Sequence, residues 1–427
     1  MKIYFSPWER WVARILSHTP GLKKRLKRAY QFLNFFIFRP GFTDRGLSSV
    51  EDIAPKQIGE TFFGYYDKSP VNSSGDYVLF HQVNHSTLEA PSASQPIQVL
   101  CMRLSDHRVV AEFETSAYNW QQGARLQWIT ETSFVFNDFD PAVGNYVSRV
   151  VEVGRDVKTR TLPSPIYDTY EGRFFLTLNF SRLGAYSPDY GYRNIRLNER
   201  NSDKLKEDGV FFGSINAQDS QSPMLLATLD SLIKVKPVAT MRGAQHTINH
   251  IMISPDGTSF LVIHRWLNGG QRFDRLFNIS IDGKRKRILA DRSMVSHLSW
   301  INSTTVGGFF RNDSGTDGYF TIDVLTGEQK DLISWTSWKL GDGHPSFRPG
   351  VMLTDSYPNK ARLKVLSLVD FRNHRIITLG EFFESLRYHG ESRCDLHPRF
   401  SPDGHFVYFD SVHSGRRRLY RMHIGGL

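Results

Sequence analysis

Four histidines in the second half of the chain occupy one position of a repeated segment. Each is followed three residues later by a large apolar side chain; the four are His250, His297, His344 and His397. They follow one another at intervals of 47, 47 and 53 residues. A fixed period of about 40–50 residues is typical of propeller blades. Equivalent positions of a closed ring face its axis, so we expect the four imidazoles to converge on one site.

Imidazoles that converge on an axis can bind a metal ion or transfer protons. Neutral imidazole is a common ligand for divalent metals, and we expect two or three of these histidines to hold Mn²⁺, Zn²⁺ or a similar ion, helped by Asp395 or His246. The others are suited to proton transfer because histidine titrates near neutral pH. One histidine at this position of a propeller often bonds only the neighbouring blade, whereas four in register favour a functional site.

The same frame extends into the first half of the chain, where cations stand at the histidine position. Lys68 and Arg125 occupy it in the first two units, and we expect them to attract a carboxylate or sulfate group. A third early unit, centred on residues 171–173, keeps the turn but loses the axial residue. The chain therefore contains seven units, near residues 68, 125, 170, 250, 297, 344 and 397.

Short apolar or alternating runs, broken by glycine, asparagine and aspartate turns, fill the chain after about residue 45 and read as strands. Two copies of Ser-Pro-Asp-Gly, at 254–257 and 401–404, are turn sequences. These features predict an all-β fold: a seven-bladed β-propeller over residues 44–427. The last unit has room for only three strands before Leu427, so we expect residues 44–61 to supply the closing strand and remove an exposed sheet edge.

The N-terminal 43 residues differ from the rest and predict a short helical extension. A basic cluster precedes an apolar run, Phe32–Phe38, that is too short to span a bilayer; the cluster is Lys23, Lys24, Arg25, Lys27 and Arg28. With Trp8 and Trp11 it can form an interfacial amphipathic helix that touches a membrane. The alternative is a helix packed on the main domain. No clear signal peptide is visible, and we expect a cytoplasmic or membrane-peripheral protein.

The charge balance indicates anionic partners. Lysine plus arginine number 53 against 43 aspartates and glutamates, and such a surplus attracts nucleic acid, anionic glycan or anionic lipid. No RNA-recognition or helix-turn-helix pattern is present, so we do not expect nucleic acid. The two cysteines, Cys101 and Cys394, are too few and too distant for a disulfide framework or a cysteine-based metal site.

Two groups of residues are candidates for contacting a sugar. Aromatic and amide side chains precede the second and third units, and an excess stretch at 181–223 adds aromatic and basic ones; the candidates are Trp120, Gln122, Tyr170, Tyr192 and Arg193. Flat rings stack on sugar faces and amides bond hydroxyl groups. We interpret the excess stretch as a lid over the axial funnel. The alternatives are inter-blade packing for the aromatic residues and a solvated loop for the stretch.

Several catalytic motifs are absent from the sequence. No Gly-x-Ser-x-Gly elbow, phosphate-binding loop or dinucleotide fingerprint occurs, which argues against a serine peptidase and against nucleotide chemistry. Glycoside hydrolysis by paired carboxylates stays open, because Asp67, Asp342 and Asp395 all lie near blade entries.

At residues 250–257, 297–300 and 397–404 the chain resembles the oligogalacturonate lyases and related seven-bladed propeller polysaccharide lyases. The resemblance covers the region from about residue 240 to the end, and the first half more weakly. It implies a divalent metal held by a histidine of a middle blade and by a cluster in the last blade. His297 matches the first and His397 the last of these histidines. Ser392 and Asp395 stand where the family has glutamine and a second histidine.

With His344 from the repeat, the expected metal ligands are His297, His344, His397 and Asp395. The resemblance also implies that His246 or His250 abstracts a proton. Cleavage of a uronate by β-elimination removes the proton α to a carboxylate, which a metal or a cation must neutralise. Arg125 and Lys68 are the expected cations, and Tyr66 is the tyrosine expected to take part in proton transfer.

Three functions fit these patterns. The first is a polysaccharide lyase, a carbon–oxygen lyase acting on an anionic uronate-containing polysaccharide or oligosaccharide. The second is a non-catalytic propeller that binds glycan or protein in surface-polysaccharide metabolism. The third is a metal-dependent glycan hydrolase on the same ring.

Overall fold

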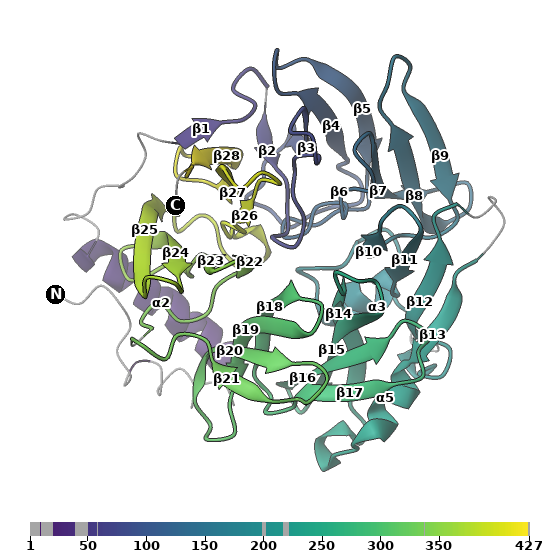
Figure 1. The fold of residues 1–427 in the computed structure, drawn as a ribbon, viewed down its shortest axis with the longest axis vertical. Helices are drawn as coiled ribbons and strands as arrows, with labels where there is room; N and C mark the ends of the chain where they lie inside the picture. Colours follow the sequence, from purple (N-terminus) through teal and green to yellow (C-terminus); the bar gives the residue numbers. More distant parts are fainter. Residues whose placement is uncertain are drawn as a thin grey trace.

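The computed structural model describes Glu9 and residues 20–38, 50–57, 59–198, 202–216, 222–336 and 338–425. Within these ranges the strands form seven four-stranded antiparallel sheets around one axis, as the view down the ring shows (Figure 1). The predicted fold, a seven-bladed β-propeller with a short N-terminal helix, is confirmed. Trp8 and Trp11 lie outside the described residues.

The blades follow one another along the chain. Blade 1 contains β2 (Glu60–Phe62), β3 (Tyr77–Val83), β4 (Ile97–Arg103) and β5 (Val109–Thr115). Blade 2 contains β6 (Gln127–Trp128), β7 (Ser133–Asp140), β8 (Asn145–Glu152) and β9 (Lys158–Leu162). Blade 3 contains β10 (Asp168–Tyr170), β11 (Phe174–Thr177), β12 (Gly209–Ser214) and β13 (Met224–Thr228). Blade 4 contains β14 (Gln245–Ile253), β15 (Ser259–Asn268), β16 (Gln271–Ser280) and β17 (Lys286–Ala290).

The last three blades complete the ring. Blade 5 contains β18 (Val295–Asn302), β19 (Thr305–Arg311), β20 (Asp317–Asp323) and β21 (Gln329–Asp331). Blade 6 contains β22 (Ser346–Arg348), β23 (Val351–Thr354), β24 (Leu363–Asp370) and β25 (Arg375–Phe383). Blade 7 contains β26 (Arg399–Phe400), β27 (Phe406–Ser411), β28 (Arg418–His423) and, as its outer strand, β1 (Val50–Asp52).

The ring closes where the start of the propeller meets its end. Strand β1, which lies within the segment 44–61, pairs antiparallel with β28, with Glu51 opposite Arg421. The buried guanidinium of Arg418 reinforces this closure. It donates to both carboxylate oxygens of Asp52, at 2.8 and 3.0 Å, and to the carbonyl of Gly59 at 3.0 Å. One side chain thus joins the two ends of the propeller.

The core lies between neighbouring sheets, and the repeated aromatic position explains part of it. In the second and fifth blades a tryptophan stands three residues after the axial position and reaches back to the preceding blade. The indole of Trp128 donates to the carbonyl of Pro70 at 2.9 Å, and that of Trp300 donates to the carbonyl of Met252 at 3.1 Å. The aromatic ring fills the space between blades, while its N–H satisfies a backbone carbonyl. The repeat therefore encodes both strand pattern and blade packing.

His81 on β3 ties the stability of the ring to pH. Its ring is fully buried, stacks on Phe62 with centroids 4.7 Å apart, and accepts a hydrogen bond from the backbone N–H of Ala124 at 3.1 Å. Burial lowers its pKa to about 4, whereas the unfolded chain has a histidine pKa near 6.5. The unfolded state therefore binds the proton first as the pH falls.

We expect His81 to remove about 2.5 kcal/mol of unfolding free energy between about pH 7.5 and about pH 4.5. Urea denaturation at both pH values measures this loss. In His81→Gln, which keeps an acceptor for the Ala124 N–H, the loss between the two pH values should shrink by about that amount. An unchanged pH dependence in the variant would contradict the assignment.

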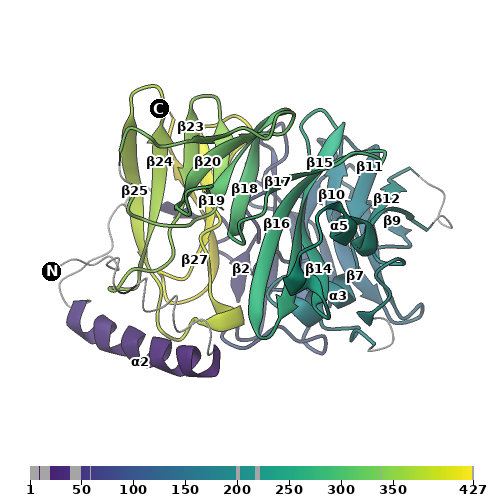
Figure 2. The same cartoon turned by 90° about the horizontal axis from the view of Figure 1, so that it is seen from below.

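The helices lie outside the blades. Helix α2 (Pro20–Phe38) runs across one face of the propeller beneath the later blades (Figure 2), and its Phe35 stacks on Phe383 with centroids 6.0 Å apart. The others are α3 (Phe180–Tyr186), α5 (Leu229–Val235) and the short 3₁₀ helices η4 (Ala239–Met241) and η5 (Gly390–Ser392). Among the described residues, no helix combines the length and apolar character needed to cross a bilayer.

The excess stretch at 181–223 has two parts. Asn179 caps α3, accepting hydrogen bonds from the backbone N–H groups of Ser181 and Arg182. After α3, Tyr190 lies beside the axial His250, and the third strand of blade 3, β12, begins at Gly209. Strand β12 therefore belongs to the sheet rather than to an insertion, because it is the third strand of its blade.

Candidate functional site

The four repeat histidines, called the axial histidines below, lie side by side at the centre of the ring. Ring centroids are 6.2 Å apart for His250 and His297, 4.0 Å for His297 and His344, and 4.3 Å for His344 and His397. All four are buried. Residues nearly fifty positions apart meet here because His250 and His297 lie within the innermost strand of their blades, and His344 and His397 lie two residues before it.

Two of these histidines have a strained backbone. His250 and His397 adopt φ values of 55° and 45°, as does the equivalent Arg125 at 51°. A left-handed conformation costs a non-glycine residue on the order of 1–3 kcal/mol, and such residues cluster at active sites and ligand clamps. The packing of the ring thus holds these side chains in a conformation that they would not choose alone.

His344, Asp395 and His397 form a candidate metal triad, since each offers one ligand atom and these atoms lie within 4.8 Å of one another. The Nδ1 atom of His344 faces Asp355 Oδ1 at 2.8 Å, and that of His397 faces the carbonyl of Gly64 at 2.9 Å. Each ring therefore keeps Nε2 for a ligand. The Nε2 atom of His397 is buried without a hydrogen-bond partner.

Two of the three triad residues have the protonation state that binding of a metal cation requires. Burial lowers the pKa of His397 well below its usual value, so its imidazole is neutral. Burial alone would raise the pKa of Asp395, but Lys364 and Arg393 hold it well below the ordinary range. At His344 burial acts downward, yet the carboxylate of Asp355 raises its pKa. Since a metal ligates only the deprotonated nitrogen of His344, this raised pKa makes metal binding at the triad weaken as the pH falls.

The donor set fits a divalent metal. Two imidazoles and a carboxylate are common ligands for Zn²⁺ and Mn²⁺, and the Asp355 carboxylate behind His344 is the second-layer partner that such histidines usually have. His297 stands next to the triad but not within it: its Nδ1 faces Asp342 Oδ1 at 3.3 Å.

Tyr65 and His250 form a hydrogen-bonded pair beside the triad. The hydroxyl of Tyr65 meets Nε2 of His250, and the Tyr65 ring lies 5.0 Å from that of His397. Burial raises the pKa of Tyr65 and lowers that of His250, in both cases strongly. The pair therefore consists of a neutral phenol and a neutral imidazole, one able to give a proton and the other to accept one.

The neighbouring Tyr66, the tyrosine predicted from the sequence, has a different environment. Its hydroxyl donates to the carbonyl of Leu298 and accepts from the N–H of the same residue, both at 2.9 Å. Its ring borders the axial histidines, 5.3 Å from His344. The hydroxyl is thus occupied in joining the lead-in to blade 1 to blade 5, and Tyr65 is the residue that the sequence reasoning missed.

The two predicted cations are engaged in ion pairs between blades. Arg125 is buried, binds Asp67 at 2.8 Å and donates to the carbonyl of Tyr167 at 2.9 and 2.7 Å. Lys68 pairs with Asp168. These contacts neutralise both cations before any ligand arrives.

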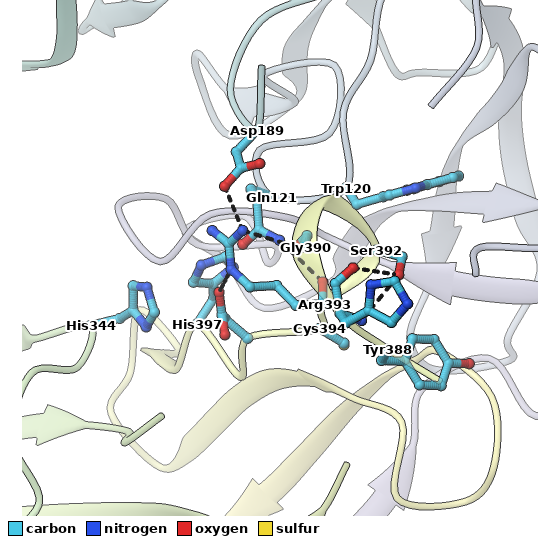
Figure 3. Close-up of polar contacts among 12 residues, drawn as sticks. Trp120, Gln121, Asp189, His344, Tyr388, Gly390, Ser392, Arg393, Cys394 and His397 are labelled. Carbon is cyan, nitrogen blue, oxygen red and sulfur yellow. Dashed lines mark hydrogen bonds and ion pairs between the residues drawn. The ribbon is translucent and has the colours of Figure 1, made fainter. Parts of the chain in front are cut away.

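Arg393 is the cation that borders a cavity. Its guanidinium binds Asp395 at 2.7 Å. It also pairs with Asp189, as Figure 3 shows. The cavity, of about 830 Å³, is lined by Arg393, Asp395 and Tyr357 on the propeller and by Arg28, Gln31 and Phe32 of α2. It therefore reaches the metal triad through Asp395.

The segment after α3 covers the axial histidines. The ring of Tyr190 lies 5.2 Å from His250 and 6.1 Å from Tyr65. Next to it, Asp189 pairs with Arg393, and Arg193 pairs with Glu391. Two ion pairs thus hold this segment, called the cover segment (residues 187–195), across the ring.

The remaining candidates lie mostly in packing positions. His246 contacts His264 and not an axial histidine. The Nδ1 atom of His246 lies 2.9 Å from the Nε2 atom of His264. Trp120 donates to the carbonyl of Glu89 at 2.8 Å, Tyr192 stacks on Phe180 at 4.4 Å, and Tyr170 stacks on Phe174 at 5.3 Å. Their apolar rings fill the spaces within and between blades, which accounts for their presence near strand ends.

Gln122 lies close to the axis of the ring, next to Tyr167. Its Nε2 donates to the hydroxyl of Tyr167 at 3.0 Å, and its Oε1 is buried without a partner. Tyr167 takes the axial position of blade 3, three residues before Tyr170, and its hydroxyl donates to Asn249 at 3.2 Å. The three-residue spacing between Arg125 and Trp128 recurs between Tyr167 and Tyr170, and this was the sequence signal that could have revealed Tyr167.

No protein-family model and no curated protein sequence matches the chain. Among solved structures, an oligogalacturonate lyase from Vibrio parahaemolyticus is similar with a TM-score of 0.57 and 12% identity, over 90% of this chain and 96% of that one. An oligogalacturonate lyase in complex with manganese has a TM-score of 0.37 and 12% identity, covering 90% and 96% of the two chains. TolB from Acinetobacter baumannii has 0.36 and 9%, covering 83% and 68%. The first similarity shows that this chain shares the fold of that lyase.

Proposed function

We propose that the axial site binds an anionic, uronate-containing oligosaccharide or polysaccharide and cleaves it by β-elimination. The observation that carries the proposal is the pair of Tyr65 and His250, a neutral acid and a neutral base beside the metal triad. The oligogalacturonate lyase whose fold this chain shares supports the substrate class.

The reaction needs a base, an acid and a positive charge. The base takes the proton α to the uronate carboxylate, the electron pair forms a carbon–carbon double bond, and the bond to the β oxygen breaks. His250 is the proposed base because it is neutral and its Nδ1 is buried without a partner. In the tautomer whose Nε2–H donates to Tyr65, Nδ1 can take the substrate proton and Tyr65 keeps its own proton. Tyr65 is the proposed acid that protonates the leaving oxygen.

Positive charge near the substrate carboxylate would come from Arg393, once the substrate displaces Asp189 from it, and from a divalent metal held by the triad. When bound by His344, Asp395 and His397, the metal would stabilise the charge that develops on the carboxylate. Arg393 lines the cavity and is already oriented by Asp395 and Asp189. A substrate carboxylate that replaces Asp189 on Arg393 would break one of the two ion pairs that hold the cover segment over the axial histidines.

The test is a panel of uronic-acid polymers incubated with the full chain. A lyase creates a double bond conjugated to the carboxylate, which absorbs in the ultraviolet. New reducing ends without that absorbance would instead indicate a glycan hydrolase. Absence of any product, together with saturable binding of a polymer, would indicate a non-catalytic binding propeller. The burial of all four axial histidines is compatible with that alternative.

Metal binding by the triad has a readout that does not depend on catalysis. A ligand that binds only the folded state adds about 2.7 kcal/mol of stability at a hundredfold excess over its dissociation constant. We therefore expect Mn²⁺ or Zn²⁺ to raise the melting temperature of the chelator-treated protein, and we expect His397→Ala to abolish that increase. The matched control is His405→Ala, since His405 is exposed. Equal metal responses in both variants would exclude the triad.

A further inference from the structure

Helix α2 presents a large apolar surface on the side facing away from the propeller. Leu26, Leu33, Phe36 and Ile37 are 46%, 59%, 69% and 51% exposed. Their spacing places them on one side of the helix. We call these four residues the outer face of α2.

The opposite side of α2 contacts the propeller and is less apolar than the outer face. Asn34 is only 6% exposed, Gln31 lines the cavity, and Phe35 stacks on Phe383. A helix that packs on a protein in water normally buries its apolar side and exposes its polar one. Here two amides and Phe35 face inward, while two leucines, an isoleucine and a phenylalanine face outward. This inversion indicates a second apolar environment beyond the helix.

The charge of α2 identifies that environment. The helix contains five basic residues in its first half and no aspartate or glutamate; they are Lys23, Lys24, Arg25, Lys27 and Arg28. A basic cluster adjoining an exposed row of leucine and phenylalanine is the pattern of a helix that lies in the interface of an anionic membrane. Near such a surface each lysine or arginine adds to the attraction.

We propose that the outer face of α2 docks on the surface of an anionic lipid bilayer. The propeller then stands with the face that carries α2 toward the lipid headgroups (Figure 2). Arg28, Gln31 and Phe32 of the same helix form one wall of the cavity that reaches Asp395. Docking thus brings the mouth of the candidate site to the membrane, where it meets acidic saccharide at the bilayer surface. Only this last step depends on the proposed function.

The experiment is co-sedimentation of the full chain with vesicles of phosphatidylcholine, with or without about 30% phosphatidylserine. We expect binding to the anionic vesicles that weakens as salt is raised, and a loss of at least about tenfold in Leu33→Glu/Phe36→Glu. A second variant, Lys23→Glu/Lys24→Glu, should lose binding to anionic vesicles to a similar extent.

The matched control is Val143→Glu/Leu325→Glu, which changes two exposed apolar residues of the propeller, 71% and 53% exposed, and should bind like the unmodified chain. Because all four substituted apolar positions are exposed, thermal unfolding should be unchanged. Equal vesicle binding by the α2 variants and the control would overturn the proposal. Equal binding to vesicles with and without phosphatidylserine would overturn it as well. A dimer in light scattering that dissociates in Leu33→Glu/Phe36→Glu, without vesicle binding, would assign the outer face to a second copy instead.

Discussion

His250→Gln is expected to lower turnover of a uronate polymer by about 10²–10⁴-fold, the usual contribution of general acid–base catalysis. Tyr65→Phe should cause a loss in the same range, because it removes the hydroxyl that meets His250 Nε2 while keeping the ring. Substrate affinity should change much less in both variants. The measurement is the initial rate of ultraviolet absorbance at saturating polymer.

The control for this prediction is the adjacent tyrosine. The hydroxyl of Tyr66 is held by both backbone groups of Leu298, so Tyr66→Phe should leave turnover near that of the unmodified protein. It should lower the unfolding free energy by about 1–3 kcal/mol, because buried backbone groups lose their partner. If Tyr66→Phe is inactive and Tyr65→Phe is active, the roles assigned to the two tyrosines are reversed.

Arg418→Met is expected to lower the unfolding free energy by about 1.5–3 kcal/mol, the usual value of hydrogen bonds to a charged group, because Asp52 is 26% exposed and can be hydrated once the guanidinium is gone. Arg418 is buried, and its loss removes the charged donor from Asp52 and from the carbonyls of Ala54 and Gly59. Among the described residues, Asp52 keeps only the Ala54 N–H and the Ala54 carbonyl only the Gln57 N–H. Since these groups belong to the closing strand and the turn after it, the ring should open there first. Urea denaturation measures the energy, and limited proteolysis after residue 50 reports the opening.

Strand β28 offers a matched control three residues away. Arg421 pairs with Glu51 on the same closing strand at 2.8 Å, but both side chains reach solvent. Exposed pairs contribute about 0–1 kcal/mol, so Arg421→Met should be nearly neutral. Comparable losses in the two variants would mean that closure depends on strand pairing alone and not on the Arg418 clamp.

The repeat in the sequence was sufficient to predict the seven-bladed propeller. Seven units and a closing segment at 44–61 follow from the period if the repeat closes into a ring, and β1, which lies within that segment, pairs with β28 of the last blade. The convergence of His250, His297, His344 and His397 follows as well. It needs no knowledge of individual contacts, because equivalent positions of a closed ring face its axis.

Tertiary contacts decided what each axial residue can do. Lys68 and Arg125 have the correct position to attract an anion, but Asp168 and Asp67 from other segments neutralise them. Tyr65 and Tyr66 are adjacent outside any strand, so no alternation rule tells which hydroxyl meets His250. Of the four metal ligands expected from the sequence, the structure groups His344, Asp395 and His397 and leaves His297 beside them, which the repeat alone does not decide. The periodicity of the sequence sets where the backbone of each axial residue lies. Interactions with distant side chains set whether that residue is protonated and whether a ligand can reach it.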